Sequence, residues 1–341
     1  MMVDLYNKSA LSLMISIGHR VGLFDALDRA GPSTSQRLAE HADLDERYVR
    51  EWLGAMTTGR IVAHDPTTNT FWLPKDHADL LTRRSAEGNL AVTAQFIPVL
   101  AGVEDEIVAC FRDGGGVPYA SFPRFHDVMA EESDQTVVAA LAEHILPLAP
   151  GLTYRLQQGI DVLDAGCGRG HAMLELAARY PSSRFLGVDL SEAAVRYAND
   201  EAQRRGRPNV TFEVLDLTAF ETDRRFDLIT SFDAIHDQAD PAGMLRGIAT
   251  SLRKDGVYLA QDIAGASRIG DNMDAPLAPF IYTISCLHCM TVSLAQGGAG
   301  LGAAWGEQLA LRMLHEAGFE RVAAHRLEHD IMNVYYVAQR T

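Results

Sequence analysis

A glycine-rich turn carries the clearest chemical pattern in the chain. Residues 162–170 read Val-Leu-Asp-Ala-Gly-Cys-Gly-Arg-Gly, an apolar run followed by the start of a helix-like segment. Glycines let the backbone approach a ligand closely, and the first turn of a helix offers free N–H groups to it. A second apolar run, 185–188, ends at Asp189, roughly 20 residues further on, where doubly wound folds bind ribose hydroxyls. The pair predicts a site for a nucleoside-containing cofactor.

The spacing of the glycines distinguishes between two classes of nucleoside-containing cofactor. Nicotinamide dehydrogenases use G-x-G-x-x-G, whereas Gly166, Gly168 and Gly170 give G-x-G-x-G with Asp164 just ahead. This pattern resembles motif I of the class I S-adenosylmethionine-dependent methyltransferases, and the resemblance covers about residues 161–262. It implies S-adenosylmethionine as cofactor, S-adenosylhomocysteine as product, and an α/β fold with a Rossmann-like, doubly wound sheet of seven strands.

The resemblance also assigns residues to the cofactor. The acid after the second strand would hold the ribose, the acid after the third strand would receive the adenine amine, and residues after the fourth would shape the pocket. The cofactor-binding residues that follow are Asp164, Gly166, Gly168, Gly170, Asp189, Leu190, Asp216, Leu217, Phe232 and Asp233. We interpret Cys167, within the glycine turn, as a packing residue because no base stands beside it in sequence.

A histidine follows the fourth expected strand. Because ligands bind at the carboxyl ends of such strands, His236 should lie over the cofactor crevice. A hydroxyl acceptor must lose its proton, and histidine titrates nearest neutral pH. His236-Asp237 resembles the His-Asp-Trp segment of small-molecule O-methyltransferases, with Gln238 in place of the tryptophan. We therefore expect His236 to be the catalytic base; the alternative is a capping or packing residue beside a nitrogen, carbon or sulfur acceptor.

Residues 275–306 contain no Asp, Glu, Lys or Arg in a chain that is 22% charged. The segment belongs to an expected insertion at about 263–306, between the fifth strand and the last helix, where methyltransferases place substrate-covering elements. Apolar and aromatic side chains with few polar groups are typical of ligand pockets. The alternative is a subunit contact. The substrate-binding residues that we predict are Phe280, Tyr282, His288, Met290 and Trp305.

The cysteines predict neither disulfides nor a metal centre. Four cysteines are too few for a disulfide framework, and no export signal is visible at the amino terminus, so we expect a cytoplasmic protein with reduced thiols. Cys286 and Cys289 have C-x-x-C spacing, but no second pair completes a zinc site. A metalloid role for these two thiols stays open. The apolar run 280–295 is too short to predict a membrane span.

The elements that position these residues alternate along the second half of the chain. Strand patterns at 161–165, 184–188, 210–215, 226–230 and 257–261 alternate with helix patterns at 171–180, 192–204 and 242–252. Such alternation indicates a parallel sheet covered on both faces. We place the methyltransferase domain at 151–341, after Pro150-Gly151, and a helical connector at 85–150.

The first 84 residues predict a largely helical winged-helix domain. Helix patterns at 5–29, 33–39 and 43–58 precede a hairpin formed by 61–63 and 70–73. Residues 1–80 hold 8 Lys and Arg against 11 Asp and Glu, and the whole chain has a formal net charge of −15. This balance disfavours nucleic acid and anionic membranes as partners. We expect a homodimer that acts on a small molecule, with a cofactor-sensing transcriptional regulator as the alternative.

Overall fold

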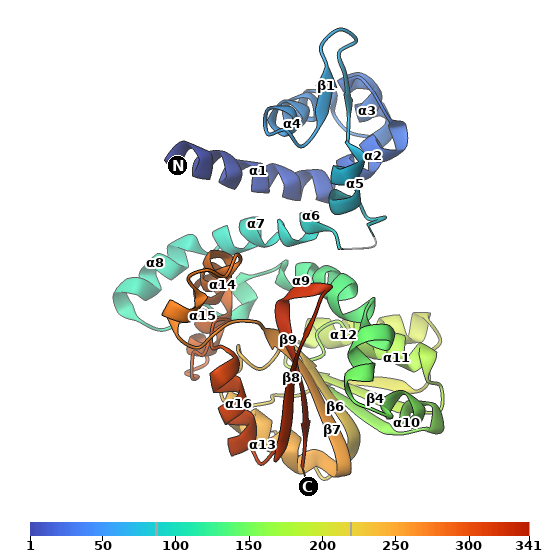
Figure 1. Cartoon of the computed structure of the whole chain (residues 1–341), viewed down its shortest axis with the longest axis vertical. Coiled ribbons are helices and arrows are strands. Elements are labelled where there is room, and N and C mark those ends of the chain that lie inside the picture. Colours follow the sequence, from blue (N-terminus) through green and yellow to red (C-terminus); the bar gives the residue numbers. More distant parts are fainter. Residues whose placement is uncertain (86–87, 219, 341) are drawn as a thin grey trace. The chain divides into compact units, whose positions relative to one another are not determined.

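The computed structural model describes residues 1–85, 88–218 and 220–340, and the chain divides into two compact units, Met1–Gly102 and Val103–Thr341 (Figure 1). Residues 86–87 of the predicted connector 85–150, and residues 219 and 341 of the predicted domain 151–341, lie outside the described residues. The predicted boundary near residue 150 differs from this division. Residues 137–149 supply six buried side chains to the core beneath the sheet, so packing joins this segment to the second unit.

The first unit has the predicted winged-helix order. Its elements are α1 (Met2–Arg20), α2 (Leu23–Ala30), α3 (Ser35–Ala42), α4 (Glu46–Thr58), β1 (Ala63–Asp65), β2 (Thr70–Trp72), α5 (Lys75–Leu81), α6 (Leu90–Thr93) and α7 (Phe96–Ala101). The single helix expected at 5–29 is two helices, because Gly22 adopts a φ of +74° between them. The side chains of Thr34 and Asp45 cap α3 and α4. Trp52 anchors the core and donates from Nε1 to the Met14 carbonyl at 2.9 Å.

The second unit contains a sheet of seven strands in the order β5-β4-β3-β6-β7-β9-β8. These are β3 (Asp161–Ala165), β4 (Arg184–Asp189), β5 (Val210–Val214), β6 (Phe226–Phe232), β7 (Leu252–Ile263), β8 (Arg321–Leu327) and β9 (Asp330–Gln339). Neighbours from β5 to β7 are parallel, and β9 runs antiparallel to both β7 and β8. The doubly wound fold is confirmed.

Helices cover both faces of this sheet (Figure 1). Those that follow its strands are α11 (His171–Arg179), α12 (Glu192–Arg204), α13 (Pro241–Ser251) and α16 (Glu307–Glu316), and α10 (Leu152–Gln158) precedes β3. Side chains along a strand alternate between the two cores: Leu228 packs with the helices on one face and Ile229 with those on the other. The strands are apolar on both sides for this reason.

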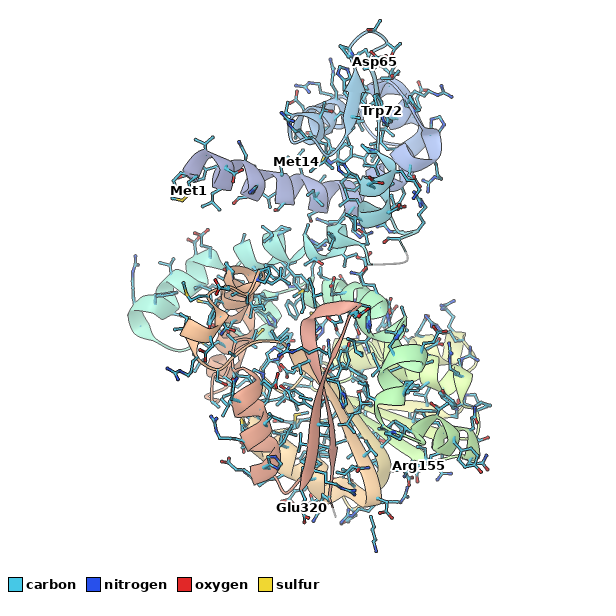
Figure 2. All side chains as sticks on the ribbon, in the orientation of Figure 1. Met1, Met14, Asp65, Trp72, Arg155 and Glu320 are labelled. Carbon is cyan, nitrogen blue, oxygen red and sulfur yellow. The ribbon has the colours of Figure 1, made fainter. Side chains whose placement is uncertain are left out.

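Arginines close the amino-terminal end of the sheet. Arg155 of α10, labelled in Figure 2, pairs with Asp227 at 3.2 Å, and Arg253 pairs with Asp161 at 2.7 Å and also with Asp227. Asp161 and Asp227, at the amino-terminal end, are therefore neutralised by arginines in partly exposed ion pairs. The functional acids lie at the opposite, carboxyl-terminal end.

Two further segments pack within this unit. The first comprises α8 (Glu104–Asp113), α9 (Phe125–Ser133) and the π-helical turns Asp134–Val138 and Leu141–Ile145. The second is the insertion, with α14 (Ala278–Ile284), a π-helical turn (Ser285–Cys289) and α15 (Met290–Ala295). Together Ala278–Ala295 form an apolar helix of 18 residues, long enough by length and composition to span a membrane, which the sequence analysis did not expect. Half of it is buried, and Val117 N donates to Thr291 Oγ1.

Candidate active site

Four acids stand at the carboxyl ends of neighbouring parallel strands. Asp164 lies on β3, Asp189 ends β4, Asp233 follows β6, and Asp262 lies near the end of β7. The chain leaves β3 toward β4 and β5, and then returns to add β6 and β7 on the other side. Such a switch in strand order forms the crevice in which doubly wound folds bind ligands.

The glycine turn and Asp189 come together as the sequence predicts. Gly168 N donates to Asp189 Oδ2 at 2.8 Å, and Ser191 N donates to Asp189 Oδ1 at 2.8 Å. Gly168 has a φ of +51° and no atom within 4 Å of the position that a Cβ would take. The turn is thus open beside a carboxylate whose two oxygens are held in place. A carboxylate in an open cradle of this kind fits a ligand that presents hydroxyl groups.

The other predicted cofactor residues differ in their surroundings. A Cβ on Gly166 would lie 2.4 Å from Ala234 Cβ, and one on Gly170 would lie 2.3 Å from the Phe212 ring, so close packing requires these two glycines. The exposed side chains of this group are Leu190 and Asp216, and Oδ1 of Asp216 accepts from Thr218 N at 2.9 Å. Leu217 is buried, and Phe232 is partly buried against the core.

Two of the acids lie in surroundings that favour their protonated form. Burial raises the pKa of Asp164 to about 7, although Thr230 donates to its Oδ1 at 2.7 Å. Asp233 has a φ of +51°, and its Oδ1 has no hydrogen-bond partner among the described residues. Burial and the nearby Asp262 charge raise the pKa of Asp233 well above its usual value. These groups add less negative charge to the crevice than their number suggests.

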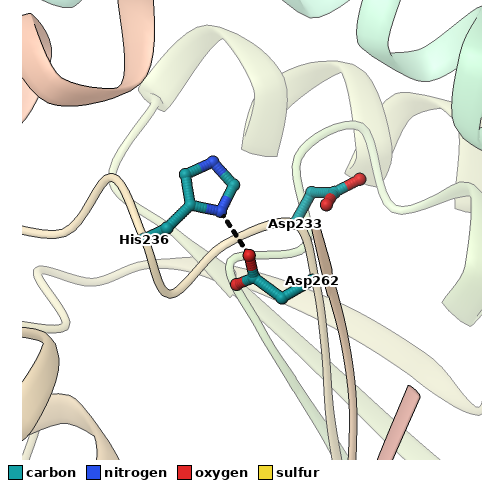
Figure 3. Close-up of side chains that lie close together, drawn as sticks. All are labelled: Asp233, His236 and Asp262. Atoms are coloured by element: carbon teal, nitrogen blue, oxygen red, sulfur yellow. Dashed lines mark hydrogen bonds and ion pairs between the residues drawn. The ribbon is translucent and has the colours of Figure 1, made fainter. Parts of the chain in front are cut away.

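His236 forms a buried dyad with Asp262 (Figure 3). The Nδ1 atom of His236 lies 2.7 Å from Asp262 Oδ1, and the two side chains are 5% and 2% exposed. Trp305 Nε1 and Ile263 N donate to the same Asp262 oxygen at 2.9 and 2.8 Å. Because the carboxylate only accepts, Nδ1 carries the proton in the neutral imidazole, and the lone pair is then on Nε2. In its neutral form the dyad therefore has the nitrogen that a base requires.

The charge of Asp262 sets the proton affinity of His236. Burial by itself lowers the pKa of an imidazole, but the Asp262 carboxylate outweighs burial, and the pKa of His236 is raised well above its usual value. The Cys289 thiol also shares a hydrogen bond with His236. Because Nδ1 faces Asp262, this bond involves Nε2. Burial raises the pKa of this thiol, so it is neutral near neutral pH and Asp262 remains the deciding charge.

Asp233, His236 and Asp262 each offer a metal-ligand atom, and these atoms lie within 4.8 Å of one another. In this arrangement Asp262 Oδ1 already accepts three hydrogen bonds. Nδ1 of His236 is the donor in one of them, so it has no lone pair to offer a cation. The group has the geometry of an oriented base.

Aromatic rings surround His288, one of the predicted substrate residues. The Phe125 ring stacks on its imidazole, with centroids 3.4 Å apart and an interplanar angle of 7°. Tyr119 and Phe122 meet it edge-on at 5.0 and 4.7 Å. We call these four residues the His288 cage. The Tyr119 hydroxyl donates to Asp237 Oδ2 at 3.5 Å, and burial raises the pKa of Asp237 to about 6.

The remaining predicted substrate residues lie on α14, at the start of α15 and in the core. Tyr282 is partly buried on α14 and its hydroxyl accepts from Asn272, while Met290 begins α15. Phe280 is partly buried on α14. Trp305 is buried in the core behind the dyad, where its indole N–H holds Asp262. The structure therefore gives Trp305 a place behind His236.

Several residues of the site escaped the sequence analysis. Asp262 lies at or near the carboxyl end of an apolar strand, as Asp164 and Asp189 do, and this shared position was a usable signal. Tyr119, Phe122 and Phe125 come from a segment without a recognisable motif, more than 160 residues before His288. Only the folded chain brings them together.

Family models match both units. Residues 9–83 match the Rv2258c-like winged HTH domain, and residues 156–318 match a methyltransferase domain. The two matches cover the winged-helix elements and the sheet from the end of α10 to the end of α16.

The chain is also similar to known methyltransferases. The chain is 33% identical over 98 residues to malonyl-[acyl-carrier protein] O-methyltransferase of Acetivibrio thermocellus, a match that covers 29% of this chain and 34% of that protein. It is 26% identical over 248 residues to methyltransferase ungE' of Aspergillus campestris, covering 69% and 67%. Human N-acetylserotonin methyltransferase, solved in complex with S-adenosylmethionine, aligns with a TM-score of 0.72 at 16% identity over 99% of this chain and 96% of that one. The last likeness shows the shared fold.

Proposed function

Because this chain belongs by its domains to the S-adenosylmethionine-dependent class I methyltransferases with an amino-terminal winged helix, we propose that it methylates the hydroxyl group of a small, largely apolar acceptor. The observation that carries the proposal is the His236–Asp262 dyad at the carboxyl ends of β6 and β7. An amine nitrogen or a thiolate is already a good nucleophile, whereas a hydroxyl oxygen becomes one only as it loses its proton. A buried, oriented imidazole is suited to removing the proton of a hydroxyl acceptor.

The crevice offers matching partners for the cofactor. Asp189 would hold the ribose hydroxyls, Gly168 would admit the cofactor beside it, and Asp216 would receive the adenine amine. When bound, S-adenosylmethionine supplies an electrophilic methyl group. The protein then needs to align the acceptor oxygen and remove its proton.

In this proposal His236 takes that proton. Nδ1 donates to Asp262, so Nε2 accepts the hydroxyl proton as the oxygen becomes nucleophilic. Asp262 stabilises the imidazolium that results, and Trp305 and Ile263 hold the carboxylate in place. These contacts orient the imidazole toward the acceptor. The acceptor hydroxyl takes the place of the Cys289 thiol at Nε2.

We further propose that the winged-helix unit serves dimerisation. On α1 the side chains of Tyr6, Leu13 and Ile17 are exposed and recur at helical spacing, which leaves an apolar stripe for a second copy of the chain. On α4, the helix that would enter a DNA groove, Arg47 pairs with Glu51 and Arg50 pairs with Glu46. Both of its bases are thus next to acids, which disfavours phosphate contacts.

The test of this function is a methyl-transfer assay with a panel of small neutral alcohols and phenols. S-adenosylhomocysteine release should depend on a hydroxyl acceptor, and the acceptor should gain one methyl group by mass spectrometry. Transfer to amines or thiols that does not require His236 would overturn the hydroxyl assignment. Salt-sensitive binding to duplex DNA would instead support a cofactor-sensing regulator.

A further inference from the structure

His288 is a buried histidine in the insertion. Its side chain is 1% exposed, and neither Nδ1 nor Nε2 has a hydrogen-bond partner among the described residues. A neutral imidazole carries one N–H donor and one acceptor nitrogen, and burial without partners carries a free-energy cost for both. A buried polar group without partners in a native protein is expected to have a functional role that offsets this cost.

The rings of the His288 cage hold this imidazole in one orientation but form no hydrogen bond with its nitrogens. Phe125 and Phe122 offer only ring atoms, and the Tyr119 hydroxyl is directed to Asp237. Burial lowers the pKa of His288 well below its usual value, and the nearby charge of His236 lowers it further. The ring is therefore neutral, with a donor and an acceptor available in its plane.

The position of His288 relates it directly to the base. It lies in the π-helical turn Ser285–Cys289, and its neighbour Cys289 shares a hydrogen bond with His236. Both His288 and Cys289 are buried although they are consecutive. Single π-helical turns are frequent at functional sites, where the extra residue changes which side chains face inward.

We propose that His288 is a specificity-determining residue that hydrogen bonds a second polar group of the acceptor, while His236 deprotonates the first. The inference rests on the proposed function. A charged group would lose its hydration among three aromatic rings without gaining an opposite charge from a neutral imidazole. The acceptor class is therefore a small neutral molecule with an apolar body and two hydrogen-bonding groups, such as two hydroxyls or a hydroxyl and a carbonyl.

A matched pair of neutral probes tests this assignment: a naphthol and the naphthalenediol that carries one further hydroxyl. Binding is measured by calorimetry with S-adenosylhomocysteine present, in the wild type, in His288→Phe and in His288→Asn. The wild type should bind the diol at least tenfold more tightly than the naphthol. His288→Phe keeps a ring of similar shape but removes both nitrogens, so both probes should bind with the affinity of the naphthol. His288→Asn keeps a donor and an acceptor and should restore part of the preference.

Two further readouts separate this role from a structural one. The diol should shift the ring-nitrogen resonances of His288 in ¹⁵N-histidine-labelled protein, with His288→Phe giving the assignment. The melting temperature of His288→Phe should equal or exceed that of the wild type, because an unpaired buried polar group is replaced by an apolar one. A lower melting temperature would show a structural role instead.

Several outcomes would overturn the assignment. They are equal binding of the two probes by the wild type, binding of neither probe, and a preference that persists in His288→Phe. Methyl transfer to the same probes is measured separately with S-adenosylmethionine. A His288-dependent preference in binding without any transfer would contradict the proposed function and leave the assignment of His288 standing.

Discussion

The indole Nε1 of Trp305 donates to Asp262 Oδ1 at 2.9 Å, the same oxygen that accepts from His236. Trp305 therefore fixes the carboxylate that fixes the base. A hydrogen bond to a charged group contributes about 1.5–3 kcal/mol of free energy, which is enough to affect the orientation of the dyad.

Substitution of Trp305 by Phe should slow turnover about tenfold through this contact. The ring still fills the core beside Ile235 and Tyr258, but the donor to Asp262 is lost. Steady-state kinetics should show a fall in kcat with little change in the affinity for S-adenosylhomocysteine. A variant with normal kcat would show that Ile263 N alone is sufficient to hold Asp262.

The pH profile should reveal the charge of Asp262. His236 acts only when unprotonated, and Asp262 raises its pKa, so the rate should rise with pH to a midpoint above the usual value of about 6.5. In Asp262→Asn the charge is gone and the midpoint should move to lower pH. The plateau rate should also fall at least tenfold, because the imidazolium loses its partner. An unchanged midpoint would contradict the electrostatic role of Asp262.

Asp189→Ala should weaken the binding of S-adenosylmethionine at least tenfold, the effect of losing about 1.5–3 kcal/mol per charge-assisted hydrogen bond. Its Oδ2 also accepts from Gly168 N, so the variant loses the contact that shapes the glycine turn. Calorimetry measures the change. Tight binding of a nicotinamide dinucleotide by the wild type would contradict the cofactor assignment.

Substitution of Leu13 and Ile17 by Glu should dissociate the proposed dimer without unfolding the winged-helix unit. Both side chains are exposed on α1, at 42% and 46%, whereas Leu23 and Phe24 are buried in the core of this unit. Sedimentation should give a dimer for the wild type and a monomer for the double variant. Circular dichroism should be unchanged, and a wild-type monomer would refute the dimer.

The sequence could predict the parts of the site that local patterns determine. Gly168 and Asp189 form the expected contact because the glycine turn and the next strand have a regular spacing in doubly wound folds. His236 lies at the expected strand end for the same reason. The winged-helix order followed from helix caps such as Thr34 and Asp45.

Contacts between distant segments could not be predicted in this way. Asp262 is 26 residues from His236 and Trp305 is 43 residues beyond Asp262, so their hydrogen bonds depend on how β6, β7 and the insertion pack. The His288 cage unites the segment before α9 with a π-helical turn, which periodicity alone does not reveal.

Turnover of His236→Ala with a confirmed hydroxyl acceptor measures the contribution of the base itself. We expect a fall in kcat of about 10²- to 10⁴-fold, the usual contribution of a general base, with the affinity for S-adenosylhomocysteine nearly unchanged. His236→Gln should not restore the rate, because an amide cannot take the proton. Near-normal turnover in His236→Ala would show that His236 is not the base and that the acceptor reaches the site already nucleophilic.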